Sequence, residues 1–485
     1  MHSEPRLQIA DAASSSSPQS SPHGLRRELR LRDLVPMQIV LVVGVNWAAI
    51  AAREGSTHPL LWIFGILLFF LPQVWVVTWC ARVWPFEGGV YQWTRAAIGP
   101  MAGFLSAWNY ALYAIFTISQ LGIQTITSLS YALGPRAAWL ASSRAWTLAL
   151  DVALLGVVLA INVLGFHYGK WVGHFGTLVM VALTLTFVVL LFWHPSATPD
   201  HPHVNPQAPF ALGWPVWSLL TLNLYTRVAF NAYSGLEQIA VFAGETRNAA
   251  RAVVLSAWMA APAIAAIYFL MTSSMLTYIP ASQIDLAGSI PQALAAAFGQ
   301  GAGIWLGRVM ILALATFTFC SFTTIAAETS RLPMVAGWDR LLPAWFARLH
   351  PRFGTPVRSL WVIVAVAMAA AVAATLSSGH EEAFQVLVSA GQLLFGVYYC
   401  AMFAVPLLAN RQRGLPQACS PASRWIKTCA ISGLSITVAA TVLALAPIVD
   451  VNNSWLFAAK VGGAALLLNF IGAAIYWRAK RAVAC

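Results

Sequence analysis

Long apolar runs constrain the fold of this sequence more than any other feature. A helix of about 20 apolar residues crosses the hydrocarbon core of a bilayer, and the 485-residue chain contains twelve runs of this kind. Hydrophobic residues make up 59% of the chain and charged residues only 9%, a balance that excludes an ordinary soluble protein. The sequence therefore predicts an all-α polytopic membrane protein with twelve transmembrane helices. The predicted spans are residues 34–52, 59–81, 100–126, 146–165, 171–193, 214–243, 255–278, 304–330, 358–377, 383–409, 425–447 and 455–477.

Basic residues between the runs test this assignment independently, because cytoplasmic loops carry an excess of Lys and Arg. The two tails and the loops after even-numbered spans hold most of these residues, whereas the opposite loops hold only Arg53, Arg136, Arg144 and Arg308. Both termini are therefore expected in the cytoplasm, with the protein in the plasma (cell inner) membrane. The net charge of +12 does not indicate nucleic-acid binding, because the basic residues are not gathered on one soluble face.

The order of the spans divides the chain into five parts. Residues 1–33 are rich in Ser and Pro and end in an arginine cluster, which predicts a disordered cytoplasmic tail. The first span begins inside and the sixth begins outside, so a repeat of five helices would be inverted in the membrane. The expected parts after the tail are a first repeat at 34–193, a second repeat at 214–409, two further helices at 424–477 and a cytoplasmic C-terminus at 478–485.

Residues 231–251 hold the strongest functional signal. A Ser234-Gly235 pair and the carboxylate of Glu237 interrupt the apolar run at 214–243. Small residues let helices pack closely in membranes, but an intramembrane charge beside them favours a broken helix, which is where transporters bind solutes. A second candidate break lies at residues 44–49, where small and polar residues interrupt a run of branched residues.

Broken helices expose binding groups. A half-helix N-terminus suits a carboxylate, and a half-helix C-terminus offers carbonyls that suit an ammonium group. Two antiparallel breaks would match a zwitterionic amino acid carried by alternating access. Glu237 is predicted to have a gating or proton-linked role, with a structural hydrogen bond to the first span as the alternative. Arg227 either faces the solute route, where it would affect selectivity, or pairs with a buried carbonyl or acid.

The sequence gives little support for redox-active cysteines, a metal site or enzyme catalysis. The six cysteines lie singly with no Cys-x-x-Cys spacing, which indicates packing residues. A loop cluster could ligate a metal, but its prolines make it a poor metal site, so no metal and no cofactor are predicted. The cluster consists of His194, Asp200, His201 and His203. Neither a catalytic triad nor a nucleotide motif is found, which argues against an enzyme.

Four stretches, in order and spacing, resemble the amino acid, polyamine and organocation (APC) transporter superfamily. The likeness runs from Val35 over nearly the whole chain, and the chain looks similar to an amino acid permease. The stretches are Ser234-Gly235-Leu236-Glu237 with residues 243–248, residues 85–93 with Gly99-Pro100, residues 330–337 with Leu342-Pro343, and residues 44–49.

The resemblance implies a LeuT-like fold with a 5+5 inverted repeat plus two C-terminal helices. It also implies a secondary active transporter for amino acids, with substrate at the unwound centres of the first and sixth spans. The implied substrate-binding residues are Asn46, Trp47, Ala48, Ala49, Ala232, Tyr233, Ser234 and Gly235. Family members often carry an aromatic gate at the position of Asn231, which leaves Phe230 or Tyr233 as substitutes. Phe322 occupies a further aromatic position, with a core aromatic as its alternative.

Two other functions stay open. A polyamine or organic cation permease would need acids in its pocket, and the spans supply few besides Glu237. A sensor that keeps the fold but moves nothing is the second alternative. The coupling mechanism is also open, with proton symport, exchange and facilitated diffusion as the alternatives. The oligomeric state is open as well.

Overall fold

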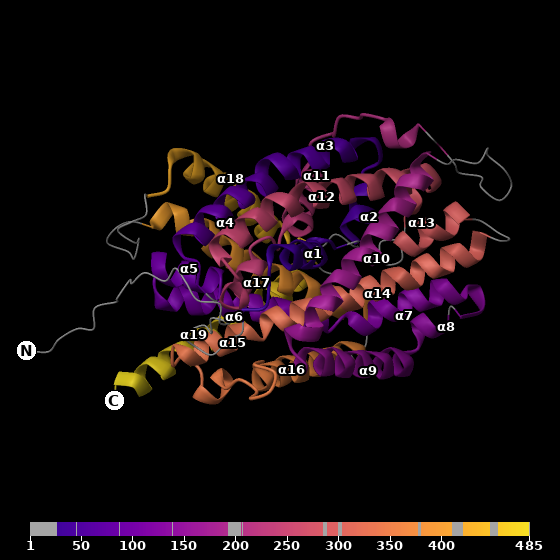
Figure 1. Cartoon of the computed structure of the whole chain (residues 1–485). Coiled ribbons are helices and arrows are strands. Elements are labelled where there is room, and N and C mark those ends of the chain that lie inside the picture. The colour runs from indigo at the N-terminus through magenta and orange to yellow at the C-terminus, as the bar shows by residue number, and fades with distance from the viewer. Residues whose placement is uncertain are drawn as a thin grey trace, which may run out of the picture.

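The computed structural model describes residues 27–484 except for 45, 87, 138, 193–204, 206, 285–288, 299–302, 377–379, 410–420 and 447–453. In this part of the chain every regular element is a helix, and the one extended pairing is an isolated bridge between Leu29 and Thr246. The helices lie roughly along one axis (Figure 1). The predicted loop cluster of His194, Asp200, His201 and His203 and most of the predicted N-terminal tail fall outside the described residues.

The bounds of the helices are as follows. The first half contains α1 (Leu31–Val42), α2 (Asn46–Ala52), α3 (His58–Gly65), α4 (Leu71–Val83), α5 (Val90–Ala97), α6 (Pro100–Ile118), α7 (Leu121–Leu133), α8 (Trp139–Ser142), α9 (Arg144–Val163) and α10 (Phe166–Phe192). The second half contains α11 (Leu219–Tyr233), the 3-10 helix η5 (Gln238–Glu245), α12 (Ala249–Tyr278), α13 (Ser289–Phe298), α14 (Gly303–Thr329), α15 (Arg331–Trp338), α16 (Val357–Leu376), α17 (His380–Leu408), α18 (Arg424–Leu443) and α19 (Ser454–Ala484).

Nine helical segments among the described residues are long and apolar enough to cross a membrane. The number rises to ten if α1 and α2, which meet at a bend of 51°, form one span. This confirms a multi-pass, all-helical membrane protein. Two of the twelve predicted spans contain helices that are shorter than these segments. α11 has 15 residues before its break, and the apolar part of α16 is Val357–Ala373. The count of twelve and the inverted repeat stay predictions.

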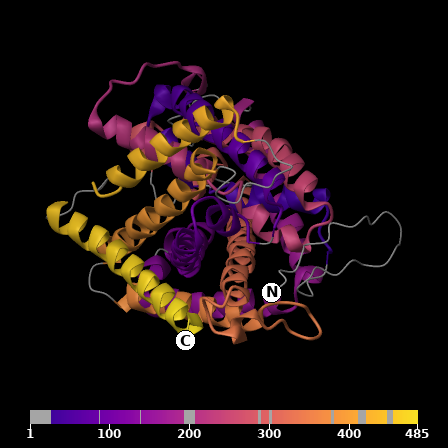
Figure 2. The same cartoon turned by 90° about the vertical axis from the view of Figure 1, so that its left-hand side faces the viewer.

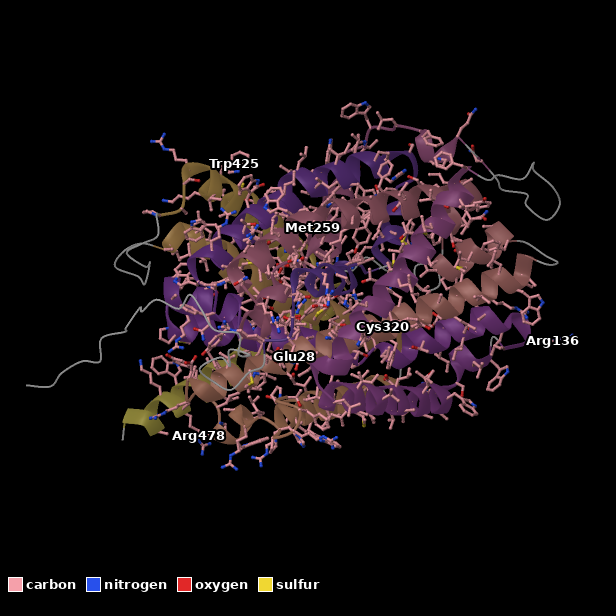
Figure 3. The ribbon with its side chains drawn as sticks, in the orientation of Figure 1. Glu28, Arg136, Met259, Cys320, Trp425 and Arg478 are labelled. Carbon is pink, nitrogen blue, oxygen red and sulfur yellow. The ribbon has the colours of Figure 1, made fainter. Side chains whose placement is uncertain are left out.

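The broken helix α1 packs against α10, α12 and α14, whereas α9 and α19 are the least buried of the long spans. Figure 2 shows α19, in yellow, at the edge of the bundle, where its apolar side chains face outward. Arg136 and Arg478 lie at opposite ends of the long axis (Figure 3). The two ends of the bundle therefore hold residues that the charge pattern assigns to opposite sides of the membrane.

Pro72 shows how the bundle satisfies backbone groups that a helix loses in an apolar setting. A proline inside a helix leaves the carbonyl four residues earlier without its usual donor. That carbonyl belongs to Leu68, which lies in the wide helical turn Ile66–Phe70 between α3 and α4. The Ser432 hydroxyl of α18 donates to it at 2.7 Å. A neighbouring helix thus supplies the bond that the proline removes.

At the start of α7, just after α6, the backbones of α7 and α9 come very close together. The Gly122 amide, in the first turn of α7, donates to the Asp151 carboxylate of α9 at 2.8 Å. A Cβ atom on Gly122 would lie 2.8 Å from the Asp151 Cα atom. Since backbone atoms cannot move aside as a flexible side chain does, only glycine fits here. The same contact places a carboxylate at the positive end of α7.

We expect Gly122→Ala to lower the free energy of unfolding by about 1–3 kcal/mol, because overpacking forces the two backbones apart. The matched control is Gly156→Ala in α9, where an added Cβ atom meets nothing within 4 Å. Thermal unfolding of both purified variants in detergent measures the difference. An equal melting temperature for the two variants would contradict the close approach.

Candidate functional site

The first helix breaks between α1 and α2, and α12 holds the freed backbone. The Gly44 amide donates to the Tyr268 hydroxyl at 2.8 Å, and this hydroxyl donates to the Val42 carbonyl at 3.1 Å. The Thr272 hydroxyl donates to the carbonyl of Ala48 at 3.2 Å. Backbone groups on both sides of the break are therefore satisfied inside the protein, as an apolar setting requires.

The second break separates α11 from η5. Ser234 leaves the helical conformation with ψ of 148°, and Gly235 has φ of +118°, which a residue with a Cβ atom rarely adopts. The Gly235 amide donates to the Tyr399 hydroxyl of α17 at 2.6 Å. The carbonyl of Leu236 accepts a bond of 2.8 Å from the Gln38 side chain of α1. This last bond joins the two broken helices.

Glu237 is fully buried directly after the break. One of its carboxyl oxygens, Oε2, accepts hydrogen bonds from the Tyr399 hydroxyl and, at 2.9 Å, from the Gln73 amide of α4. Gln73 also donates to the Tyr399 hydroxyl at 2.8 Å. The other oxygen, Oε1, has no hydrogen-bond partner among the described residues. The observed partners of Glu237 thus belong to α4 and α17, whereas Gln38 of α1 bonds to the backbone of Leu236.

A cavity of about 320 Å³ lies between the two breaks. This volume is in the range of pockets that bind small molecules. Val42, Gly44 and Ser234 contribute to its wall, so both interrupted segments border it. The aromatic residues around it are Trp47, Tyr110, Tyr113, Phe116, Phe317, Phe322 and Phe395, and the amide side chains are Asn46, Gln120, Gln124, Asn231, Gln238 and Gln392.

The chemical character of this wall is polar but uncharged. The described residues that line the cavity include no Asp, Glu, Lys, Arg or His. Amide groups can both donate and accept hydrogen bonds, and the aromatic rings supply apolar surface. The lining therefore suits a solute that has both polar and apolar parts.

The structure divides the predicted site residues into two groups. Asn46, Trp47, Ser234 and Phe322 line the cavity. The others are buried behind it or beside it: Ala48, Ala49, Arg227, Phe230, Ala232, Tyr233, Gly235 and Glu237.

Neither of the two candidates for an aromatic gate lines the cavity, although Phe230 packs on the lining residue Phe395. Tyr233 stacks on Phe70, with ring centroids 4.4 Å apart. Phe230 makes an edge contact with Tyr399 at 5.3 Å. Asn231 itself lines the cavity and bonds through its amide nitrogen to the Arg227 carbonyl at 2.8 Å.

Several lining residues were not singled out from the sequence, among them the amides at the start of α7 and in α17. Gln120, Gln124 and Gln392 each interrupt an apolar run, and polar groups inside a membrane span are costly unless they face protein or a cavity. That cost was a signal, but it does not say which face of the helix is turned inward.

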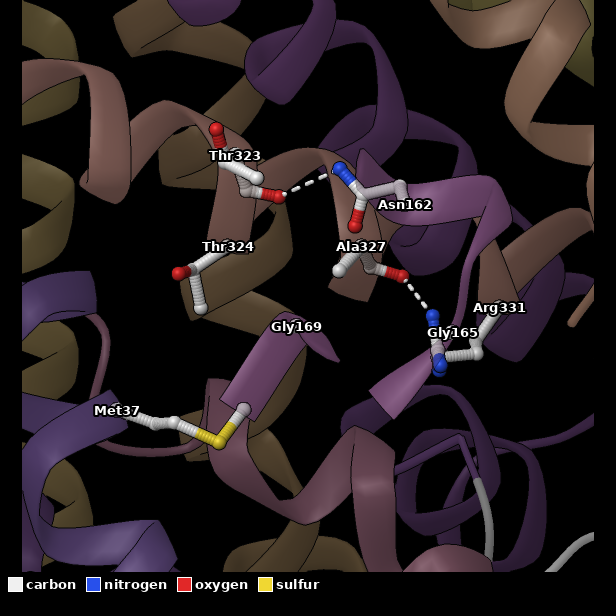
Figure 4. Close-up of a pocket in the computed structure, with 8 residues that line it drawn as sticks. All are labelled: Met37, Asn162, Gly165, Gly169, Thr323, Thr324, Ala327 and Arg331. Atoms are coloured by element: carbon white, nitrogen blue, oxygen red, sulfur yellow. Dashed lines mark hydrogen bonds between the residues drawn. The ribbon is translucent and has the colours of Figure 1, made fainter. Parts of the chain in front are cut away.

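A second, smaller pocket lies nearer the start of α1 (Figure 4). It measures about 10 Å³, room for a single water molecule. The Asn162 amide donates to the Thr323 carbonyl at its edge at 3.0 Å, and Arg331 donates to the carbonyl of Ala327. A solute larger than water does not fit there, so the larger cavity is the candidate site.

The chain matches the family described as amino acid permease over residues 34–468. It belongs to this family. The permease is 23% identical over 459 residues to an uncharacterized transporter of Legionella pneumophila, covering 92% of this chain and 96% of the relative. It is 22% identical over 366 residues to the methylthioribose transporter of Bacillus subtilis, covering 72% of this chain and 76% of the relative.

A third relative is the cationic amino acid transporter 6, chloroplastic, of Arabidopsis thaliana. The permease is 23% identical to it over 354 residues, covering 69% of this chain and 58% of the relative. The family and these relatives are transporters and not enzymes, which confirms the predicted class. They also confirm the resemblance on which that prediction drew.

Tyr399→Phe tests how the permease holds its second break. The change removes the acceptor of the Gly235 amide, and a buried donor without a partner costs about 1–3 kcal/mol. We expect a lower melting temperature and reduced uptake of substrate. The control is Tyr476→Phe, because the Tyr476 hydroxyl makes no hydrogen bond in the described part of the chain. Equal stability and uptake in both variants would contradict a role for Tyr399 at the break.

Proposed function

We propose that this chain is a secondary active permease that moves amino acids across the plasma membrane by alternating access. Substrate occupies the cavity between the two breaks, and both chain termini face the cytoplasm. The observation that carries the proposal is the position of the cavity, which two interrupted helices border and which no ionisable Asp, Glu, Lys, Arg or His lines among the described residues.

The main binding groups in this proposal are backbone groups of the breaks other than those that Tyr268, Thr272, Tyr399 and Gln38 already bond. Unwound helix segments in an apolar setting leave amide and carbonyl groups that a ligand can satisfy. An amino acid presents one carboxylate and one ammonium, which match amides at one helix end and carbonyls at another. Asn46, Trp47 and Ser234 then contact the substrate, while Ala48, Ala49, Ala232, Tyr233 and Gly235 keep the backbone in place behind them.

The charge of the wall favours an amino acid over a polyamine. A polyamine carries several positive charges and needs acids to replace its water. Glu237 lies behind the wall, where Gln73 and Tyr399 already bond to it. The relatives named for methylthioribose and for cationic amino acids differ from each other in substrate, so the proposal rests on this chain's own cavity.

Glu237 has the gating or proton-linked role in this proposal. It is buried, it follows the break at Gly235 directly, and the same Tyr399 hydroxyl bonds to both residues. A change in the charge of Glu237 would therefore alter the bonds that hold the break. Phe230 belongs to the same group as a ring packed on Tyr399, and Phe322 acts from the cavity wall.

Uptake by purified protein in proteoliposomes tests the substrate class. We expect radiolabelled amino acids to accumulate and an excess of unlabelled amino acid to reduce this uptake at least about tenfold. Putrescine and spermidine should have no such effect, because the cavity wall offers no carboxylate to their amines. Competition by polyamines alone would reject amino acids as the substrate. A complete absence of flux would instead support a sensor of the same fold.

Glu237→Gln tests the proton-linked role. The substitution keeps the size of the side chain and an oxygen for Gln73 and Tyr399, but it removes the group that can gain or lose a proton. We expect uptake by the unaltered protein to differ between acidic and neutral external pH. Uptake by the variant should be the same at both values. A variant that keeps the original rate and pH profile would exclude Glu237 as a proton site.

A further inference from the structure

Arg227 is a buried cation whose charge no acid balances in the described part of the chain. It lies in α11, and only 7% of its surface is exposed. None of the ion pairs between described residues includes it. Arg331 shows the usual arrangement, because it is 3% exposed and pairs with Glu245 at 3.0 Å. A buried charge normally needs such a partner.

The Arg227 side chain donates hydrogen bonds to two side chains, which are both neutral and both belong to α17. Its Nε atom donates to the Gln392 amide oxygen at 2.8 Å, and one terminal nitrogen donates to the Ser389 hydroxyl at 3.4 Å. These bonds satisfy part of the guanidinium, which has five N–H groups. They do not cancel its charge.

Two residues that form hydrogen bonds with Arg227, one with its side chain and one with its backbone, line the cavity. Gln392 lines the cavity and accepts from the Arg227 side chain. Asn231, one helical turn along α11, also lines the cavity and donates to the Arg227 carbonyl. The bond to Arg227 turns the amide oxygen of Gln392 toward the arginine, so the amide nitrogen is its remaining group. That nitrogen makes one long bond, at 3.4 Å to the Ala440 carbonyl.

Two buried acids, Glu237 and Glu328, are already bonded to other residues. Glu237 bonds to Gln73 and Tyr399, and Glu328 accepts from the Tyr110 hydroxyl. Neither has a hydrogen bond to Arg227. The Gln392 amide nitrogen has a second N–H besides the one bonded to Ala440. An anionic group in the cavity that accepts from this N–H would have the unbalanced positive charge of Arg227 on the other side of the amide, a charge-assisted arrangement.

We propose that Arg227, acting through Gln392, makes the cavity selective for amino acids whose side chain carries a second carboxylate. This inference rests on the proposed function, and it narrows the substrate to the acidic class. The α-carboxylate and ammonium bind at the breaks, and the side-chain carboxylate binds at Gln392. Cationic amino acids are excluded because their side chain would lie beside Arg227 without an acid in the wall.

Competition between molecules of matched shape tests this selectivity. Glutamate and glutamine, and likewise aspartate and asparagine, differ mainly in the charge of the side chain. We expect each acid to compete for uptake in proteoliposomes at least about tenfold better than its amide. The same order should appear in the thermal stabilisation of the purified protein by each compound, which measures binding without transport.

Three variants and one control separate charge from packing. Gln392→Glu places a carboxylate beside Arg227 and should abolish the preference for acids, as should Arg227→Gln. Arg227→Lys keeps the charge and should retain the preference. Arg308→Gln is the control, since it removes a positive charge that lies over the Trp305 ring and away from the cavity wall. It should leave the ratio of acid to amide unchanged.

The outcomes are distinct. Uptake of amino acids with equal competition by acid and amide would overturn this inference and leave the proposed function standing. Neither binding nor uptake of any amino acid would overturn both. If Arg227→Gln does not fold, the ratio in the unaltered protein and in Gln392→Glu decides, because a ratio near one in the unaltered protein contradicts the inference by itself.

Discussion

The arrangement of the bundle depends on hydrogen bonds that other helices make to the backbone where α1 and α11 are interrupted. In lipid no water is present to bond to a freed amide, so an interrupted helix persists only if other parts of the protein replace its bonds. Here the glycine at each interruption donates a hydrogen bond from its amide to a tyrosine hydroxyl of another helix. Gly44 donates to Tyr268, and Gly235 donates to Tyr399. The cavity lies between the breaks, so these bonds also determine where solute can bind.

A second connection joins the start of α1 to the end of η5. The amide of Leu29, just before α1, donates to the Glu245 carbonyl, and the Arg247 amide donates back to Leu29. The Glu245 side chain pairs with Arg331 at the end of α14. The start of α1 and the end of η5 are therefore bound into one group, which limits how far either can move alone.

The sequence was sufficient for the membrane class. It also singled out two regions in which a helix ends, although residues 46–49 of the first region are helical and belong to α2. Ser234-Gly235 beside Glu237 is costly in an apolar run, and cost of this kind is visible without a structure. The partners were not visible, because Tyr399 lies 164 residues from Gly235 and Gln392 lies 165 from Arg227. Polar residues in predicted spans can be found by reading the chain. Which of them meet depends on how the helices rotate and pack, and local sequence does not contain that information.

The Tyr399 hydroxyl has a further consequence that follows from valence alone. A hydroxyl has one hydrogen to give and two lone pairs. Tyr399 gives its hydrogen to Glu237 and receives from Gly235 and Gln73, so its capacity is full. A newcomer that bonds to the Tyr399 hydroxyl must therefore take the place of an existing bond, whereas Oε1 of Glu237 stays open to a donor. The Gly235 amide and the Glu237 carboxylate, which lie on either side of Leu236, thus depend on one oxygen atom, and a displacement of Tyr399 disturbs both of them in the same event.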